Sequence, residues 1–258
     1  MGILPPFRFL LSASAAVAFS LMADDTGTQG KGKYRLEFTG EASWEKEHVD
    51  GVETRENGGN LAATLSAGAA DSVDIVIGFP WLWNRVKEDG ATVSDESGAG
   101  DASLEVKWRF LEKGGFSLAV KPGVSLPTGN EGKGLGNGRP PYGVTLIASQ
   151  DFERSFLYFN VGYVHNEYKL DGDRATSRGD IWSGSVAAGV KIMESLTLVA
   201  DIGVETNAEK ESHTWPAFLL GGFIYSIADE LDVDLGVKTG LNRPETDLAV
   251  LAGVTWRF

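Results

Sequence analysis

The sequence lacks cysteine altogether among its 258 residues. This absence excludes a disulfide scaffold, a thiolate metal site and a lipoprotein attached through an N-terminal cysteine. Long apolar runs are also missing, because no 18-residue stretch after residue 23 is free of polar residues, which argues against transmembrane helices. Positive charge is in deficit as well, with a formal net charge of −13, so the chain repels a phosphate backbone and no nucleic-acid partner is expected.

The first 23 residues have the composition of a secretory signal peptide. Arg8 supplies the positive start, and the stretch from Phe9 to Ala23 is apolar or small, interrupted only by serine. Ala23 is the predicted cleavage point, although Leu21, three residues before the cut, is larger than is usual there. An N-terminal anchor helix is the alternative. We expect a signal peptide over 1–23, a short segment over 24–32 and one domain over 33–258.

The dominant pattern after residue 30 has a period of two, which is the signature of β-strands. In the last segment, Val250, Val254 and Trp256 fall on one face, while Gly253 and Arg257 fall on the other. Twelve segments repeat this alternation of large apolar residues with charged or small ones. They cover 33–47, 59–70, 73–85, 101–111, 115–126, 142–152, 155–167, 180–192, 195–206, 214–227, 230–241 and 246–258.

The links between these segments alternate in length. Five are short turns, at 71–72, 112–114, 153–154, 193–194 and 228–229. Six are longer loops, at 48–58, 86–100, 127–141, 168–179, 207–213 and 242–245. Short turns on one side and longer loops on the other are typical of a transmembrane barrel, with both termini on the short-turn side. The sequence therefore predicts an all-β, up-and-down antiparallel barrel of about twelve strands.

A secreted β-sandwich also fits the alternation, since its charged faces would point to solvent. Two features favour lipid instead. The segments run about ten to thirteen residues, as needed to cross a bilayer at a tilt, whereas soluble strands average about five or six. Aromatic residues sit near segment ends on the apolar face, as in interfacial girdles. These are Tyr34, Trp44, Trp81, Trp83, Trp108, Phe110, Tyr142, Trp182, Trp215, Tyr225, Trp256 and Phe258.

Two stretches resemble known outer-membrane proteins. Trp256 and Phe258, closing an alternating strand, resemble the C-terminal signal that implies insertion by the barrel-assembly machinery. The stretch 121–129, with the glycine-rich 131–138, resembles the family of outer-membrane proteins named for the MetA pathway of phenol degradation. Its motif residues are Lys121, Pro122, Leu126, Pro127, Thr128 and Gly129. The family's association with passage of small organic compounds implies a transport role, with aromatic compounds among the permeants.

Other chemistry-bearing patterns have simpler interpretations. The glycine-rich stretch 129–138 lacks the Gly-Lys-Ser/Thr of a phosphate loop and is flanked by strands, so we interpret it as an extracellular loop. His48, His165 and His213 lie near loop-side strand ends without a suitably spaced serine, which disfavours a hydrolase. Asp171, Asp173 and Asp180 depart from EF-hand spacing and are interpreted as a solvated acidic loop. No cofactor and no metal site are predicted.

Charged residues on the small-residue face are the candidate functional residues. Lone buried charges are costly, so these side chains must face water or each other inside the barrel. The candidates are Arg35, Glu37, Glu41, Glu105, Lys107, Arg109, Lys121, Asp201, Glu205, Asp232, Asp234 and Lys238, with Glu45, Lys191 and Arg257 sharing that face. A wet lumen whose charges tune selectivity is one interpretation, and a plugged interior of ion pairs is the other.

Three functional hypotheses follow. The first is a passive channel for small solutes in the bacterial outer membrane, the second a structural or adhesive barrel with a closed interior, and the third a membrane-embedded hydrolase. The channel is preferred, because a twelve-stranded barrel is wider than the eight-stranded barrels that side chains fill. The expected partners are outer-membrane lipid and lipopolysaccharide, the barrel-assembly machinery, periplasmic chaperones and a small-molecule permeant.

Overall fold

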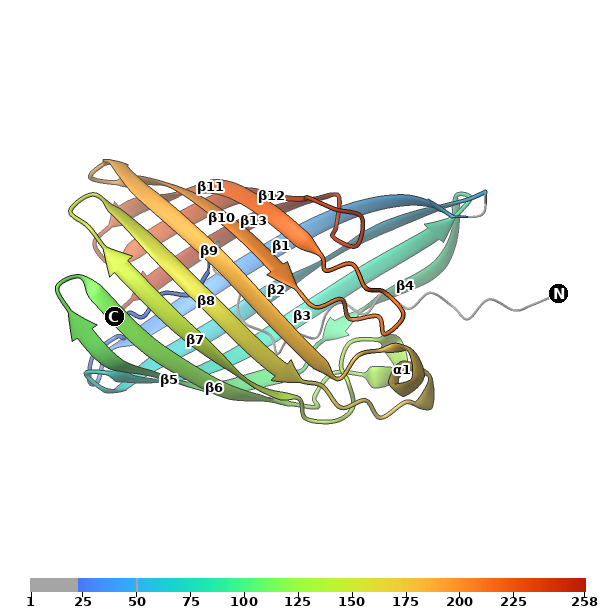
Figure 1. The fold of residues 1–258 in the computed structure, drawn as a ribbon, viewed down its shortest axis with the longest axis horizontal. Helices are drawn as coiled ribbons and strands as arrows, with labels where there is room; N and C mark the ends of the chain where they lie inside the picture. Colours follow the sequence, from blue (N-terminus) through green and yellow to red (C-terminus); the bar gives the residue numbers. More distant parts are fainter. Residues whose placement is uncertain (1–22, 50) are drawn as a thin grey trace.

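The computed structural model describes residues 23–49 and 51–258, so the predicted signal peptide, Ala23 excepted, lies outside the described residues. Antiparallel strands form one sheet whose two ends pair (Figure 1). The strands are β1 (Tyr34–Val49), β2 (Val52–Ala70), β3 (Val73–Glu88), β4 (Ala91–Ala99), β5 (Ala102–Lys113), β6 (Phe116–Leu126), β7 (Tyr142–Asp151), β8 (Ser155–His165), β9 (Asp180–Met193), β10 (Leu196–Glu205), β11 (Ala217–Ala228), β12 (Leu231–Gly240) and β13 (Leu248–Arg257). Two short helices, η1 (Glu131–Lys133) and α1 (Asp171–Thr176), lie in loops. In the described part of the chain, no helix has the length and apolar character to cross a membrane.

The sheet closes into a barrel of twelve strands, as predicted. β4 and β5 are two parts of one barrel strand, because both pair with β3: β4 along Trp81–Glu88 and β5 along Val73–Gly78. Pairing of β1 with β13 completes the ring from Arg35↔Arg257 to Trp44↔Leu248. Over the length that all strands share, the closed ring leaves no strand edge unpaired. A sheet that spans lipid must be closed in this way.

The barrel wall carries its large apolar side chains on the outside. Phe38, Leu61 and Phe79 are exposed by 54%, 58% and 61%, whereas the intervening inner residues Glu37 and Ser66 are almost fully buried. Most of the predicted girdle aromatics are likewise exposed, while Trp83 is half-buried over Gly59. An apolar surface that surrounds a closed barrel is stable in a bilayer and not in water. The barrel is therefore of the outer-membrane type.

Two predicted loops are in fact hairpins. The loops expected at 48–58 and 86–100 are wrong, because β1 runs to Val49, β2 starts at Val52, and β3 and β4 pair up to Glu88↔Ala91. The turn residues Asp89 and Gly90 have φ of 46° and 85°, and Gly51 has φ of 86°. Such positive φ values belong to tight hairpin turns, for which Asp-Gly is a strong signal. The first four barrel strands therefore project beyond the rest (Figure 1).

The ends of the barrel domain meet at the short-turn side. The backbone N–H of Tyr34 donates to the carbonyl of Phe258 at 2.8 Å, and that of Phe258 donates back at 3.0 Å. The two rings stack with centroids 5.6 Å apart. The C-terminal aromatic residue thus seals the junction between the first and last strands.

Candidate functional site

The interior of the barrel is the candidate functional site. All twelve predicted pore-lining residues are buried or half-buried on the inner face. On β5, for example, Glu105 and Lys107 are 7% and 2% exposed, whereas Val106 is 40% exposed. The side chains so placed are Arg35, Glu37, Glu41, Glu105, Lys107, Arg109, Lys121, Asp201, Glu205, Asp232, Asp234 and Lys238. Their contact with a permeant stays a prediction.

Several of these residues form ion pairs with charged residues nearby in the wall. Lys238 on β12 lies between Glu41 and Glu245, at 3.6 and 3.4 Å. Arg257 contacts Asp232 at 2.6 Å near the short-turn end. Because these pairs run along the wall, they satisfy charges locally and do not tie opposite walls together.

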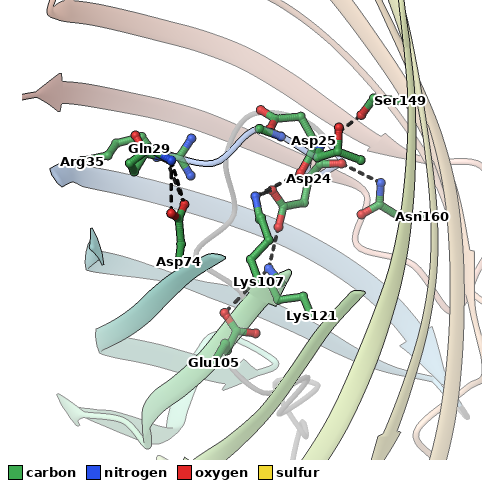
Figure 2. A network of polar contacts seen from close by, with 12 residues as sticks. Asp24, Asp25, Gln29, Arg35, Asp74, Glu105, Lys107, Lys121, Ser149 and Asn160 are labelled. Atoms are coloured by element: carbon green, nitrogen blue, oxygen red, sulfur yellow. Dashed lines mark hydrogen bonds and ion pairs between the residues drawn. The ribbon is translucent and has the colours of Figure 1, made fainter. Parts of the chain in front are cut away.

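Residues 23–32, which we call the luminal segment, cross the interior of the barrel (Figure 2). The backbone N–H of Ala23 donates to Asp201 on β10 at 2.7 Å. At the other end, the N–H of Gln29 donates to both carboxylate oxygens of Asp74 on β3 at 3.1 Å. The segment therefore reaches from one side of the ring to the other and occupies part of the bore.

The inner face also carries one small apolar patch. Val199, Leu220, Ala249 and Leu251 form a buried cluster on β10, β11 and β13, and Phe156, Phe218 and Ile224 pack against it. These residues interrupt the inner charges with a surface that water wets poorly. The interior is therefore mixed, with charged walls and an apolar strip.

Asp101, which lies between β4 and β5, holds the loop 127–141 at the loop-side mouth of the barrel. Its carboxylate accepts the N–H groups of Gly129 at 2.8 Å and Asn137 at 3.1 Å. Burial raises the pKa of Asp101, although these two N–H groups act in the opposite direction. Thr128 adds a second attachment, accepting from the N–H of Ala102 at 2.9 Å and donating to the carbonyl of Gly100 at 2.9 Å.

Three loops pack together at this mouth around a cavity of about 430 Å³. Its lining includes Arg139, Glu167, Tyr168, Arg174, Ser177 and Lys210. Burial raises the pKa of Tyr168 to about 12, and a hydrogen bond from Lys169 lowers the pKa of the nearby loop residue Glu131. The Arg178 guanidinium donates hydrogen bonds to the backbone carbonyls of Asn207, Lys210 and Ser212. These bonds show that the loops form an ordered cap.

The histidines and loop aspartates do not assemble into a chemical centre. His165 contacts Asp180 at 2.8 Å and its ring lies against Tyr142, while His48 contacts Glu53 at 3.2 Å. Asp171 pairs with Arg174 within α1. Among residues 23–49 and 51–258, no group of three His, Cys, Asp or Glu side chains is arranged to hold a metal ion.

Sequence reasoning missed the partners of the luminal segment. Asp74, Ser149 and Asn160 all contact it from inner-face positions. The alternation of their strands already placed them on the inner face, so this signal was available. For Asp24 no such signal existed, because the segment has no periodicity and its contacts are distant in sequence.

Comparison with known proteins identifies the family. The family described as "Putative MetA-pathway of phenol degradation" matches residues 23–258. The chain belongs to this family. No curated protein has significant sequence similarity to this member of the MetA-pathway family.

Solved structures share the fold of this MetA-pathway family member. The COG4313 outer membrane channel from Pseudomonas putida F1 superposes with a TM-score of 0.71 at 13% identity, covering 92% of this chain and 99% of that one. The KdgM porin in complex with disordered oligogalacturonate gives 0.58 at 7% identity, covering 87% and 99%. The translocator domain of the autotransporter NalP from Neisseria meningitidis gives 0.53 at 11%, covering 90% and 91%.

Proposed function

We propose that this protein is a passive channel for small organic solutes. The observation that carries the proposal is the character of the inner face, which is charged and polar along most strands and includes a small apolar cluster. Charged side chains are stable at such positions when water reaches them or when partners neutralise them. An interior of this kind suits a water-filled path with selective walls.

The mixed lining supports organic permeants. The patch of Val199, Leu220, Ala249 and Leu251 gives an apolar surface to one side of a solute, while charged groups along the wall satisfy polar groups. Association of the family with phenol degradation agrees with such compounds. We therefore propose small aromatic molecules bearing a polar substituent as the first class to test.

Reconstitution in planar bilayers is the direct test. The purified processed protein should give discrete conductance steps, and liposomes containing it should admit phenol-sized solutes faster than liposomes without it. A preparation of the same protein unfolded by heat serves as the control. A correctly folded barrel that stays silent in bilayers and does not speed solute entry would overturn the proposal.

A structural barrel with a closed interior is the second candidate. It is favoured by the luminal segment, which lies in the bore and whose retained residues are attached to Lys107 and Lys121 through Asp24 and to Asp74 through Gln29. This candidate predicts that deletion of the gene leaves solute permeability unchanged but weakens the envelope against detergent. The same deletion strain therefore separates the two candidates.

The route of the protein to the membrane is also a proposal. We propose that residues 1–23 are cleaved as a signal peptide, that periplasmic chaperones deliver the chain, and that the assembly machinery recognises the strand ending in Trp256 and Phe258. We also propose that the protein is not an enzyme, because the described hydrogen bonds bring no hydroxyl nucleophile to His165. Mass spectrometry of the membrane-extracted protein tests the cleavage site.

A further inference from the structure

Two lysines of the barrel wall meet one carboxylate inside the barrel. Lys107 on β5 and Lys121 on β6 are 2% and 5% exposed. The Nζ of each lies 2.6 Å from a different oxygen of Asp24 in the luminal segment (Figure 2). Glu105 contributes a weaker contact to Lys121 at 3.6 Å. Asp24 is therefore the main counter-charge of both lysines.

The position of Asp24 is fixed by its backbone and by its neighbours. Asn160 on β8 donates to the Asp24 carbonyl at 2.8 Å, and Lys107 Nζ donates to the Asp25 carbonyl at 3.0 Å. The N–H of Thr26 donates to the Ser149 hydroxyl on β7 at 3.0 Å. With three neighbouring strands holding it, the carboxylate is positioned before any solute arrives.

Asp24 decides the charge of this wall. With it, the two lysines face two carboxylates, Asp24 and Glu105, and the charges of these four side chains cancel. Without it, the lysines face Glu105 alone, and the wall gains one uncompensated positive charge. A positive charge in a confined path favours anions and opposes cations.

The opposite side of the barrel is acidic. Glu205 on β10 and Asp234 on β12 form no ion pair with any residue that the structure describes. In the order of the sheet, β12 lies across the ring from β6. Once Lys107 and Lys121 are neutralised, these carboxylates add negative charge to the path that a solute follows.

We propose that Asp24 is a selectivity-determining residue of the channel. By neutralising Lys107 and Lys121, it leaves the acidic wall to set a preference for cations over anions, and for neutral or cationic solutes over acidic ones. This inference rests on the proposed channel function. It assigns the luminal segment a specific task beyond narrowing the bore.

The test is the reversal potential of single channels in a KCl gradient. The wild-type protein should prefer K⁺. The Asp24→Asn variant should lose that preference, with the K⁺ to Cl⁻ permeability ratio falling roughly two- to fivefold, because one unit charge is added close to the path. The matched control is Asp25→Asn, which removes the same charge from the next residue, whose carboxylate forms no ion pair with either lysine, and it should shift the ratio much less.

A double variant separates local neutralisation from net charge. Adding Lys121→Met to Asp24→Asn should restore a ratio close to that of wild type, since the remaining Lys107 and Glu105 carry opposite charges that again cancel. If Asp24→Asn fails to assemble, Lys121→Met alone keeps the test, with an expected shift toward stronger K⁺ preference. Mass spectrometry of each mature protein confirms that residue 24 is retained.

The outcomes distinguish this inference from the proposed function. A folded wild-type barrel without conductance would overturn the channel itself. Conductance with equal shifts for Asp24→Asn and Asp25→Asn, or with no shift for either, would overturn the role of Asp24 while the channel stands. A wild-type preference for Cl⁻ would also overturn it.

Discussion

At the scale of single residues, Gly129 shows how one missing methyl group shapes the loop-side mouth. A Cβ at this position would lie 2.1 Å from the carbonyl oxygen of Leu135 and 3.1 Å from Asp101 Oδ1. Only glycine lets the two arms of the loop 127–141 come this close while the Gly129 N–H reaches Asp101. The close approach accounts for glycine at position 129 of this chain.

Replacing Gly129 with alanine should therefore loosen the loop. The Gly129→Ala variant must displace backbone atoms, and we expect opening of the loop to become easier by about 1–3 kcal/mol. Limited proteolysis of the folded protein in detergent should show faster cleavage within 127–141. Gly132→Ala is the matched control, because its nearest atom is a side-chain oxygen at 3.2 Å. Equal protease resistance in both variants would contradict the explanation.

At the scale of elements, the strands β1 to β4 extend further than a membrane requires. β2 has 19 residues and β1 and β3 have 16 each, whereas about 9–11 residues cross a bilayer. The projecting part is charged, with an ion pair between Arg85 and Asp95 at 2.8 Å. It therefore stands in water and adds little to the stability of the barrel in lipid.

Shortening this hairpin should leave the barrel intact. Val86 and Ser94 are register partners, so residues 87–93 can be replaced by Asn-Gly to form a two-residue turn at the same place. We expect the shortened protein to fold, to keep its heat-modifiable mobility on gels and to conduct as before. Loss of assembly would show that the projecting sheet is needed for folding.

Sequence reasoning found the strands of the membrane part and missed the hairpin ends for one physical reason. Where one face meets lipid, apolar residues alternate sharply with small or charged ones, as around Val250 and Gly253. Beyond the bilayer both faces meet water, so stretches such as 53–57 are polar throughout and lose this contrast. The Asp-Gly pairs at 50–51 and 89–90 were the remaining signal. The crossing of the bore by residues 23–32 depends on distant contacts that periodicity does not encode.

At the scale of the whole molecule, the luminal segment determines how much of the bore is free. In the processed protein it runs from Asn160 on β8, which binds the Asp24 carbonyl, to Asp74 on β3, and it is attached to the wall by side chains of several strands. Fusing the signal sequence directly to Lys33 should therefore raise the single-channel conductance of the assembled barrel, because the cross-section for ions grows. An unchanged conductance would mean that the segment does not obstruct the path.

Closure of the ring yields a further prediction. The junction of β1 and β13 ends in two backbone hydrogen bonds and a ring contact between Tyr34 and Phe258. Removing Phe258 should reduce the fraction of assembled protein in outer-membrane extracts several-fold, because both the ring contact and the terminal pairing are lost. Phe110→Ala, which truncates another outward aromatic residue that is 47% exposed, should have a smaller effect. Equal loss in both would indicate general weakening of the outer wall.

The projecting hairpins also have unpaired strand edges. Beyond the Trp44↔Leu248 pair, Glu45–Val49 of β1 pairs only with β2, and in the described strands β4 pairs only with β3. Unpaired strand edges can pair with a strand of a neighbouring molecule and so join copies edge to edge. The rim of β1 carries Lys46, Glu47 and His48, whose charge and hydration discourage such growth. These charged side chains therefore oppose the addition of a strand from a neighbouring barrel.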